Sequence, residues 1–401
     1  MNVFLRVACA LFASALSLQA GAADAPAEAA SAAPPAMPAA STATGRCQAP
    51  TGVHAADHAC AVGLARHADA ERAAGHDDAA LAALASADQF SPDDLRFAMA
   101  RSSLSLKAAN QLTPAGIDAA ARAAPADIGL AMLHAELSIA KKQYRNAVAD
   151  VDRVLAQRPG AVMAWELRAT ADVALPDFDA ARGDVDHALH LEPKSSLTLR
   201  MRAILRNNSG DHDGALADFE AAHALAPLPE DPFVIGSTQF LQRHFAAAAA
   251  TLATRPPAAP DGIYWRLWRY MAVARLAGIE PASGSLGPGT QPGPGEPWPG
   301  PVVDYFHGSI DAAMLLSDAK KSQEARDLSQ VCEARFYMAE DSLLRQRGDA
   351  IALFQQTLKE CPINFHEYEG AMAELKAAGA ALPASAPVAA PAPPAAASSA
   401  S

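Results

Sequence analysis

The chain has 401 residues, with 44 acidic against 32 basic side chains and a formal net charge of −12. A nucleic-acid-binding protein normally carries a basic face, so this balance argues against that class of function. Beyond the N-terminal segment no stretch is long and apolar enough to span a bilayer, and a soluble mature protein is expected.

The N-terminal segment predicts a cleaved secretory signal over residues 1–22. Arg6 precedes the apolar run VACALFASALSL, and the small residues Ala20 and Ala22 offer a signal-peptidase site. An uncleaved anchor is the alternative, but the run is short for a membrane span. Cys9 lies inside this run instead of at its end, so lipid attachment is not expected. A periplasmic or otherwise exported location is expected.

Low-complexity sequence occupies both ends of the expected mature chain. Residues 23–45 and 380–401 are rich in Ala, Pro and Ser and lack the large apolar side chains that a core needs. They are expected to be disordered, the first as a linker and the second as a tail.

Cysteines and histidines cluster near the start of the expected folded region. The cluster comprises Cys47, His54, His58, Cys60 and His67. A metal site is one interpretation, because His54 and His58 are one helical turn apart. The other is a disulfide with exposed histidines, which export favours. The four cysteines outside the signal allow three pairings. Proximity favours Cys47–Cys60 and Cys332–Cys361.

A repeat of 34 residues runs through the centre of the chain. Prolines recur at 92, 125, 159, 193 and 227, with spacings of 33, 34, 34 and 34. Within the units 128–161, 162–195 and 196–229, alanines recur at positions 8 and 20, and a looser copy spans 61–94. Small residues allow two helices to approach closely, and proline near position 32 ends the second helix.

This pattern resembles the tetratricopeptide repeat (TPR). The resemblance implies an all-α solenoid, a right-handed superhelix of about seven or eight antiparallel helix hairpins, with the array over 46–260 and TPR-like hairpins over 261–379. In TPR proteins the first helices line the concave face. The corresponding positions here are expected to bind protein partners, as extended or helical peptide segments: Met132, Glu136, Met163, Glu166, Thr170, Leu197, Arg200, Ile204, Asn207, Asn208, Val234, Thr238, Leu241 and Gln242.

The C-terminal third begins with a predicted helix over 262–278. The Gly- and Pro-rich stretch 278–301 is expected to form no helix, so the partner of 262–278 is expected after it. In the repeat frame Cys332 starts a first helix and Cys361 ends the second, which places the two side by side for a disulfide. A final helix over 364–379 is expected to cap the array.

Residues 297–376 resemble the C-terminal region of NlpI-like TPR proteins of the bacterial envelope, through DYFHG and the segment from CEARFYMAE to EYEGAMAEL. Members of that family are typically lipoproteins that act as adaptors for envelope enzymes and proteases, and this chain lacks a lipid-attachment signal.

Catalytic motifs are not evident in the sequence. The stretch FHEYEG begins like a zinc-binding H-E-x-x-H motif but has Gly370 at the second histidine, and His366 and Glu367 are expected on a solvated face. No G-x-S-x-G is present. We therefore expect a noncatalytic adaptor without cofactor or metal. The alternatives are a metal-handling or enzymatic envelope protein that uses the Cys47–His67 cluster, and an accessory scaffold for secretion or polysaccharide assembly.

Overall fold

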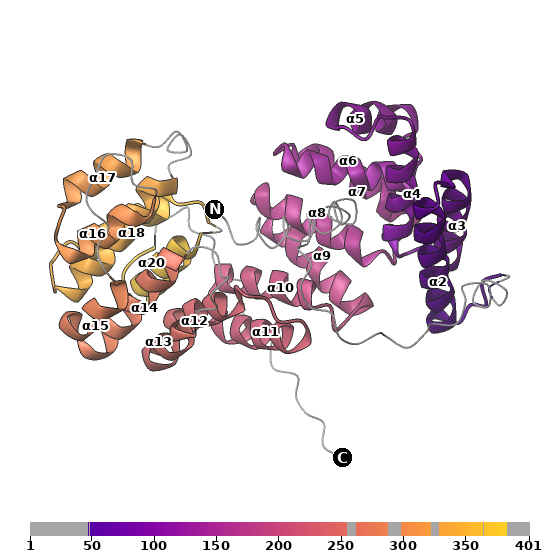
Figure 1. Cartoon of the computed structure of the whole chain (residues 1–401). Helices are drawn as coiled ribbons and strands as arrows, with labels where there is room; N and C mark the ends of the chain where they lie inside the picture. The colour runs from indigo at the N-terminus through magenta and orange to yellow at the C-terminus, as the bar shows by residue number, and fades with distance from the viewer. Residues whose placement is uncertain are drawn as a thin grey trace, which may run out of the picture. The chain divides into compact units, whose positions relative to one another are not determined.

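The computed structural model describes residues 47, 49–254, 262–287, 298–321, 329–363 and 365–382. The predicted signal (1–22), the predicted linker (23–45) and residues 383–401 of the predicted tail lie outside these residues. The described residues form helices and connecting turns and no strand, so the fold is all-α (Figure 1). The chain divides into two compact units, which meet between Pro193 and Lys194 in the sequence.

Unit 1 contains eight helices among the described residues. They are α2 (His54–Ala73), α3 (Asp77–Phe90), α4 (Leu95–Ala108), α5 (Pro114–Ala123), α6 (Ile128–Ala140), α7 (Tyr144–Gln157), α8 (Val162–Ala174) and α9 (Phe178–Leu191). The pairs α2–α3, α6–α7 and α8–α9 pack as hairpins, whereas α4 packs on α3 and α6, and α5 packs on α6.

Unit 2 contains eleven helices among the described residues. They are α10 (Ser196–Ser209), α11 (His212–Leu225), α12 (Asp231–Leu241), α13 (Phe245–Ala253), α14 (Gly262–Ala277), α15 (Ile279–Leu286), α16 (Gly300–His307), α17 (Ala312–Lys321), α18 (Ser329–Leu344), α19 (Ala350–Glu360) and α20 (His366–Ala377). The pairs α10–α11, α12–α13, α14–α15 and α18–α19 pack as hairpins, and α16 contacts α17.

The predicted repeat determines the helix bounds. First helices begin at Ile128, Val162 and Ser196, and second helices begin at Tyr144, Phe178 and His212, each 34 residues after the last. The side chains of Asp127 and Ser195 accept hydrogen bonds from backbone N–H groups in the first turn, which satisfies donors that a helix start leaves unpaired. The TPR-like hairpin prediction is confirmed.

Small side chains allow the two helices of each hairpin to pack closely. The alanines at positions 8 and 20 of the three regular units are fully buried: Ala135, Ala147, Ala169, Ala181, Ala203 and Ala215. In unit 1, Ala135 and Ala147 join larger apolar side chains such as Val151, Val154 and Leu167 in a continuous core. Close packing of this kind makes the hairpin the repeating unit of stability.

Two expectations for the C-terminal third are wrong. Residues 279–286 form α15 instead of a loop, and α15 is the hairpin partner of α14. Pro281 lies in the first turn of α15, where its missing N–H costs no helical hydrogen bond, and buried Ala282 and Leu286 attach the helix. The expected partner segment instead forms α16 and α17.

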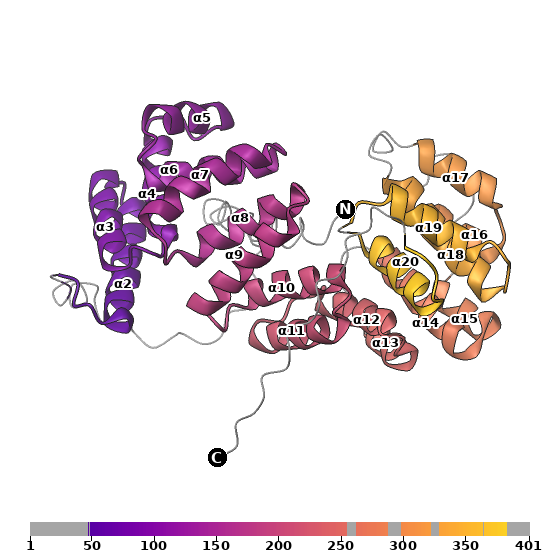
Figure 2. The same ribbon diagram turned by 180° about the vertical axis from the view of Figure 1, so that it is seen from behind.

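The last helix, α20, does not cap the end of the array with a polar face. Both views place it between α12 and α18, and it contacts α12, α18 and α19 (Figures 1 and 2). Tyr368, Ala371 and Leu375 are buried along it. The apolar side of α20 therefore belongs to the core of unit 2.

Both predicted disulfides are present. Cys47–Cys60 has an S–S distance of 2.10 Å and Cys332–Cys361 one of 2.03 Å. The second joins the first turn of α18 to the residue after α19, as the repeat frame predicted. It stabilises the hairpin immediately before α20.

Candidate binding surface

The first helices of unit 1 present part of the predicted partner-binding surface. Met132 is fully buried in the core, and Thr170 is buried with its hydroxyl donating to the Glu166 carbonyl oxygen at 2.9 Å. Glu136, Met163 and Glu166 are half-buried. These three side chains are the predicted residues of α6 and α8 that retain surface.

Glu136 differs from the acidic side chains of these repeats that pair with a basic group. Within the described residues no hydrogen bond or ion pair reaches its carboxylate, and burial raises its pKa to about 7. By contrast, Asp118 accepts from Lys141 at 3.0 Å, and Asp184 accepts from Arg168 at 2.7 Å. A half-buried carboxylate without a cation is costly for the free protein, and a cationic ligand would relieve that cost.

In unit 2 the predicted site residue Arg200 does not face an open surface. It is 4% exposed, and its Nε and Nη2 donate to the two carboxylate oxygens of Asp231 at 2.9 and 2.8 Å. Nη2 also donates to the Ala226 carbonyl oxygen. The expectation of a free cation on the concave face is wrong, because this guanidinium ties α10 to the start of α12.

Most of the remaining predicted residues of unit 2 are also interior. Asn207 donates to Thr238 at 2.8 Å, joining α10 to α12. With its amide nitrogen facing acceptors, Asn208 donates to Glu369 of α20 at 2.7 Å. The apolar side chains of Ile204, Val234 and Leu241 are buried as well, whereas Leu197 and Gln242 are half-buried. Substitutions at the buried positions would disturb packing as well as any ligand.

An ion-pair ladder follows the repeat and was missed in the sequence. Position 7 of each regular unit carries a basic or imidazole side chain, and position 23 carries a buried aspartate. The pairs are His134–Asp150, Arg168–Asp184 at 2.7 Å and Arg202–Asp218 at 2.8 Å. Each joins the two helices of one hairpin. The 16-residue spacing, repeated every 34 residues, was the signal that would have identified them.

The contact between α18 and α20 contains buried carboxylates. Glu333 is 4% exposed and accepts from Tyr264 and Trp298 at 2.6 Å each, whereas Glu367 is 5% exposed and accepts from Tyr337 at 3.2 Å. Burial and the neighbouring Glu367 raise the pKa of Glu333 to about 7, and burial raises that of Glu367. The expectation that Glu367 and the mostly buried His366 are solvated is wrong.

A second group of buried charges lies further along α18 and α20. Arg275 of α14 contacts Glu340 at 3.3 Å and Glu374 at 2.5 Å, and Arg243 reaches Glu374 at 3.1 Å. Glu340 is fully buried, and burial raises its pKa to about 8 despite the nearby guanidinium. These contacts join α14, α18, α20 and the turn before α13.

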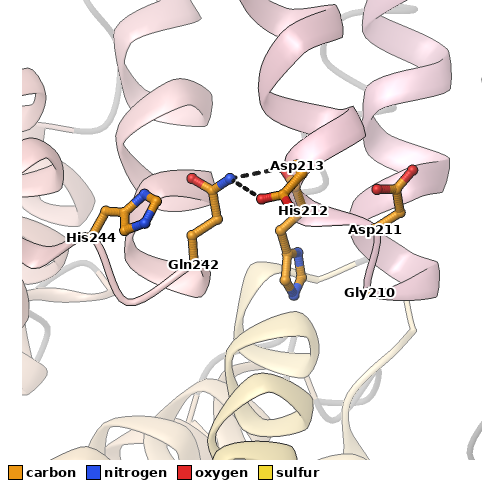
Figure 3. A pocket seen from close by; sticks show the side chains of 6 residues that line it. All are labelled: Gly210, Asp211, His212, Asp213, Gln242 and His244. Carbon is orange, nitrogen blue, oxygen red and sulfur yellow. Dashed lines mark hydrogen bonds between the residues drawn. The ribbon is translucent and has the colours of Figure 1, made fainter.

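An open pocket lies where two inter-helix turns of unit 2 meet α20. It is lined by Gly210, Asp211, His212, Asp213, Gln242 and His244. Figure 3 shows the His212 ring directed away from Gln242, whose amide donates to Asp213 at 2.7 Å. Burial lowers the pKa of His212, and its Nδ1 lies 3.1 Å from the side-chain amide oxygen (Oδ1) of Asn207. The lining of the pocket is mostly polar, which does not suit an apolar ligand.

The Cys47–His67 cluster has the arrangement of the disulfide alternative. Cys47 and Cys60 are joined, so neither offers a thiolate to a metal. His58 lies 4.0 Å from Asp94, and His67 lies 3.7 Å from Glu71. In the part of the chain that the structure describes, no group of three potential ligands is placed to hold a metal ion.

Comparisons with known proteins give fold likenesses only. No protein-family model matches the chain, and no curated protein matches it. A TPR protein from Parabacteroides merdae is 17% identical over 56% of this chain and 90% of its own, with a TM-score of 0.37. A thermophilic TPR protein from Thermus thermophilus is 17% identical over 53% of this chain and 98% of its own, with a TM-score of 0.32.

The TPR domain of P58(IPK) is 15% identical over 81% of this chain and 93% of its own, with a TM-score of 0.27. Such low TM-scores carry no weight by themselves. The TPR-like arrangement rests on the hairpins and their 34-residue period.

Proposed function

We propose that the protein is a noncatalytic adaptor that binds peptide segments of partner proteins on the first helices of unit 1. The binding surface comprises Glu136 of α6 with Met163 and Glu166 of α8, and Met132 and Thr170 lie buried beside it. The observation that carries the proposal is the half-buried, unneutralised carboxylate of Glu136. A surface that already contains such a charge favours a ligand that neutralises it.

The chemistry of this surface selects a partner class. A lysine or arginine opposite Glu136 would pair with its carboxylate, and an apolar side chain would pack on the thioether of Met163. An extended or helical segment presents such side chains at regular intervals, as peptides do in other helical grooves.

An exported setting is part of the proposal. It is supported by the predicted signal over 1–22, by the resemblance of 297–376 to NlpI-like envelope proteins, and by two disulfides, which persist in oxidising compartments. Among the described residues, no helix has both the length and the apolar character needed to cross a membrane. Docking of other envelope proteins is the role that we propose.

Crosslinking in cells, followed by mass spectrometry, tests the binding surface. Glu136→Lys reverses the charge at the proposed contact and should remove the partners that the wild type captures. Asp186→Lys is the control, because Asp186 is an exposed acid on the second helix of the next hairpin. Loss of the same partners in both variants, or in neither, would place the binding surface elsewhere.

The pH dependence of partner binding gives a sharper test. A bound cation needs the ionised form of Glu136, whose pKa is about 7 in the free protein. Binding should therefore strengthen as the pH rises from 6 to 8, with release of a proton. The Glu136→Gln variant should bind more weakly and without that dependence, as titration calorimetry with a captured peptide would measure. An unchanged pH profile in this variant would exclude Glu136 from the contact.

A further inference from the structure

The surface that receives α20 in unit 2 has the composition of a helix-binding site. Its polar contacts are Asn208 of α10, Arg243 after α12, and Arg275 of α14. Its apolar contacts include Phe233 of α12, whose ring centroid lies 5.5 Å from that of His366, and Phe336 of α18. We call these five residues the α20 acceptor surface.

The helix seated on this surface is acidic and amphipathic. Glu369 accepts from Asn208, and Glu374 pairs with both Arg243 and Arg275, while Ala371 and Leu375 are fully buried. The seated helix therefore shows which ligand the surface accepts. Such a helix places one carboxylate opposite two guanidinium groups and another opposite a side-chain amide, with apolar residues on the same buried side.

Close packing depends on a glycine in the middle of α20. A Cβ atom at Gly370 would lie 2.5 and 2.7 Å from two ring carbons of Phe336. That ring is fully buried, so it has little room to move. A larger side chain at position 370 should separate α20 from α18 without changing any charge.

The contact between α18 and α20 is weakened when its buried carboxylates ionise. Glu333 faces Trp298, Tyr264 and Glu367, and none of these carries a positive charge. Glu367 otherwise faces Tyr337 of α18 and His366 of its own helix. Two of the buried acids therefore meet across the α18–α20 contact, and among the described residues His366 is the cationic group that faces Glu367.

Glu340 is the third acid with a raised pKa at this contact. It faces Arg275, Glu374 and Arg243, so two carboxylates share the guanidinium groups there.

We propose that α20 is a detachable internal ligand, which occupies the α20 acceptor surface in cis and leaves it in alkaline medium for an acidic amphipathic helix of another molecule. The inference concerns unit 2 and does not depend on the partner surface of unit 1. Cys332–Cys361 holds the hairpin before α20, so the released helix stays tethered to the acceptor surface.

The direction of the pH effect follows from the three glutamates. Their pKa values are raised in the seated state, to about 7 for Glu333 and about 8 for Glu340. Seating is therefore most favourable below about pH 4.5, near the ordinary glutamate pKa, and it weakens as the pH rises through about 8.

Hydrogen exchange of the wild-type chain tests release without any substitution. After correction for intrinsic exchange, the amides of α20 should lose at least tenfold of their protection between pH 5.5 and pH 8. Those of α10 and α11 in the same unit should change by less than threefold. Equal changes in α20 and α10–α11 would overturn the proposal, because they would report general loosening.

Peptide binding tests the acceptor surface itself. A fluorescein-labelled peptide of residues 365–382 should bind full-length Gly370→Val at pH 5.5 at least tenfold more tightly than it binds wild type at the same pH, where the wild-type surface is occupied by its own α20. Gly284→Val, at an exposed helical glycine with open space around it, should behave as wild type. A peptide with glutamine at 374 should bind at least fivefold more weakly. If Gly370→Val is folded and leaves the peptide unbound, the acceptor surface is not a binding site.

Discussion

Charged side chains are arranged differently in the regular repeats and in the C-terminal helices. In the repeats, each buried aspartate at position 23 pairs with a side chain 16 residues earlier in the same hairpin, as Arg168 does with Asp184. Around α20, charged and polar partners come from distant segments: Tyr264 and Glu333 are 69 residues apart, and Arg243 and Glu374 are 131 apart.

This contrast relates sequence separation to stability. When the buried charges of a hairpin pair within that hairpin, the hairpin needs only its sequence neighbours in order to fold, as in other repeat arrays. The α20 contact needs α14, α18, α20 and the turn before α13 to be in place before its buried acids find partners, and three of those acids then retain raised pKa values. We infer that α20 opens more readily than α6–α9.

The largest expected effect is at the buried pair Arg200–Asp231. In Arg200→Met, the Asp231 carboxylate stays buried and loses the guanidinium that pairs with it, although His223 remains 2.9 Å away. Removing one member of a buried pair costs about 3–5 kcal/mol. Denaturant-dependent hydrogen exchange should show this loss in α10–α13 and little change in α6–α9.

Arg182→Met provides the control in a regular repeat. Arg182 pairs with Asp179, whose side chain is 91% exposed, so the change should cost less than about 1 kcal/mol. Equal losses in the two variants would contradict the structural role of the buried Arg200 pair.

The next largest effect is at the second disulfide. Cys332 and Cys361 are 29 residues apart, and opening a loop of that size costs about 3–4 kcal/mol in the chain-entropy model. The Cys332→Ala/Cys361→Ala variant should lose protection in α18–α20 and keep it in α6–α9. Added reductant should not destabilise α18–α20 further. Non-reducing peptide mapping of the wild type should recover both disulfides, and free thiols would contradict them.

The sequence was sufficient to predict the repeat because its determinants are local. Alanines at fixed positions, helix-ending prolines and the positions of Cys332 and Cys361 all act within one hairpin, and both disulfides were predicted. Glu136 was also placed on the first-helix surface, where it is half-buried. Whether a cation lies near Glu136 depends on the folded structure, so its raised pKa could not be predicted from the sequence.

The wrong predictions concern residues whose surroundings are set by segments that are distant in the sequence. Arg200 looked like a surface cation because its partner Asp231 lies in the next repeat, and the repeat frame assigns both to separate hairpins. Glu367 looked solvated because α18, which buries it, is not adjacent to it in the sequence. In α15 the single proline occupies the first turn, so the density of Gly and Pro around it was a poor guide.

The smallest expected effect is a gain in stability within the regular repeats. Gly183 lies inside α9, is exposed, and has no atom within 4 Å of the position of an added Cβ. Gly183→Ala should therefore stabilise the α8–α9 hairpin by about 0.5–1 kcal/mol, since alanine loses less backbone entropy on helix formation. Gly63→Ala in α2 has the same open surroundings and should gain a similar amount. Hydrogen exchange should show each gain only in the substituted hairpin and its neighbours. In a repeat array each hairpin contacts only its neighbours, so a stabilising change has little effect on distant repeats. A gain of equal size in α18–α20 would show that the two units unfold together, and the contrast between local and distant partners would then have no consequence for stability.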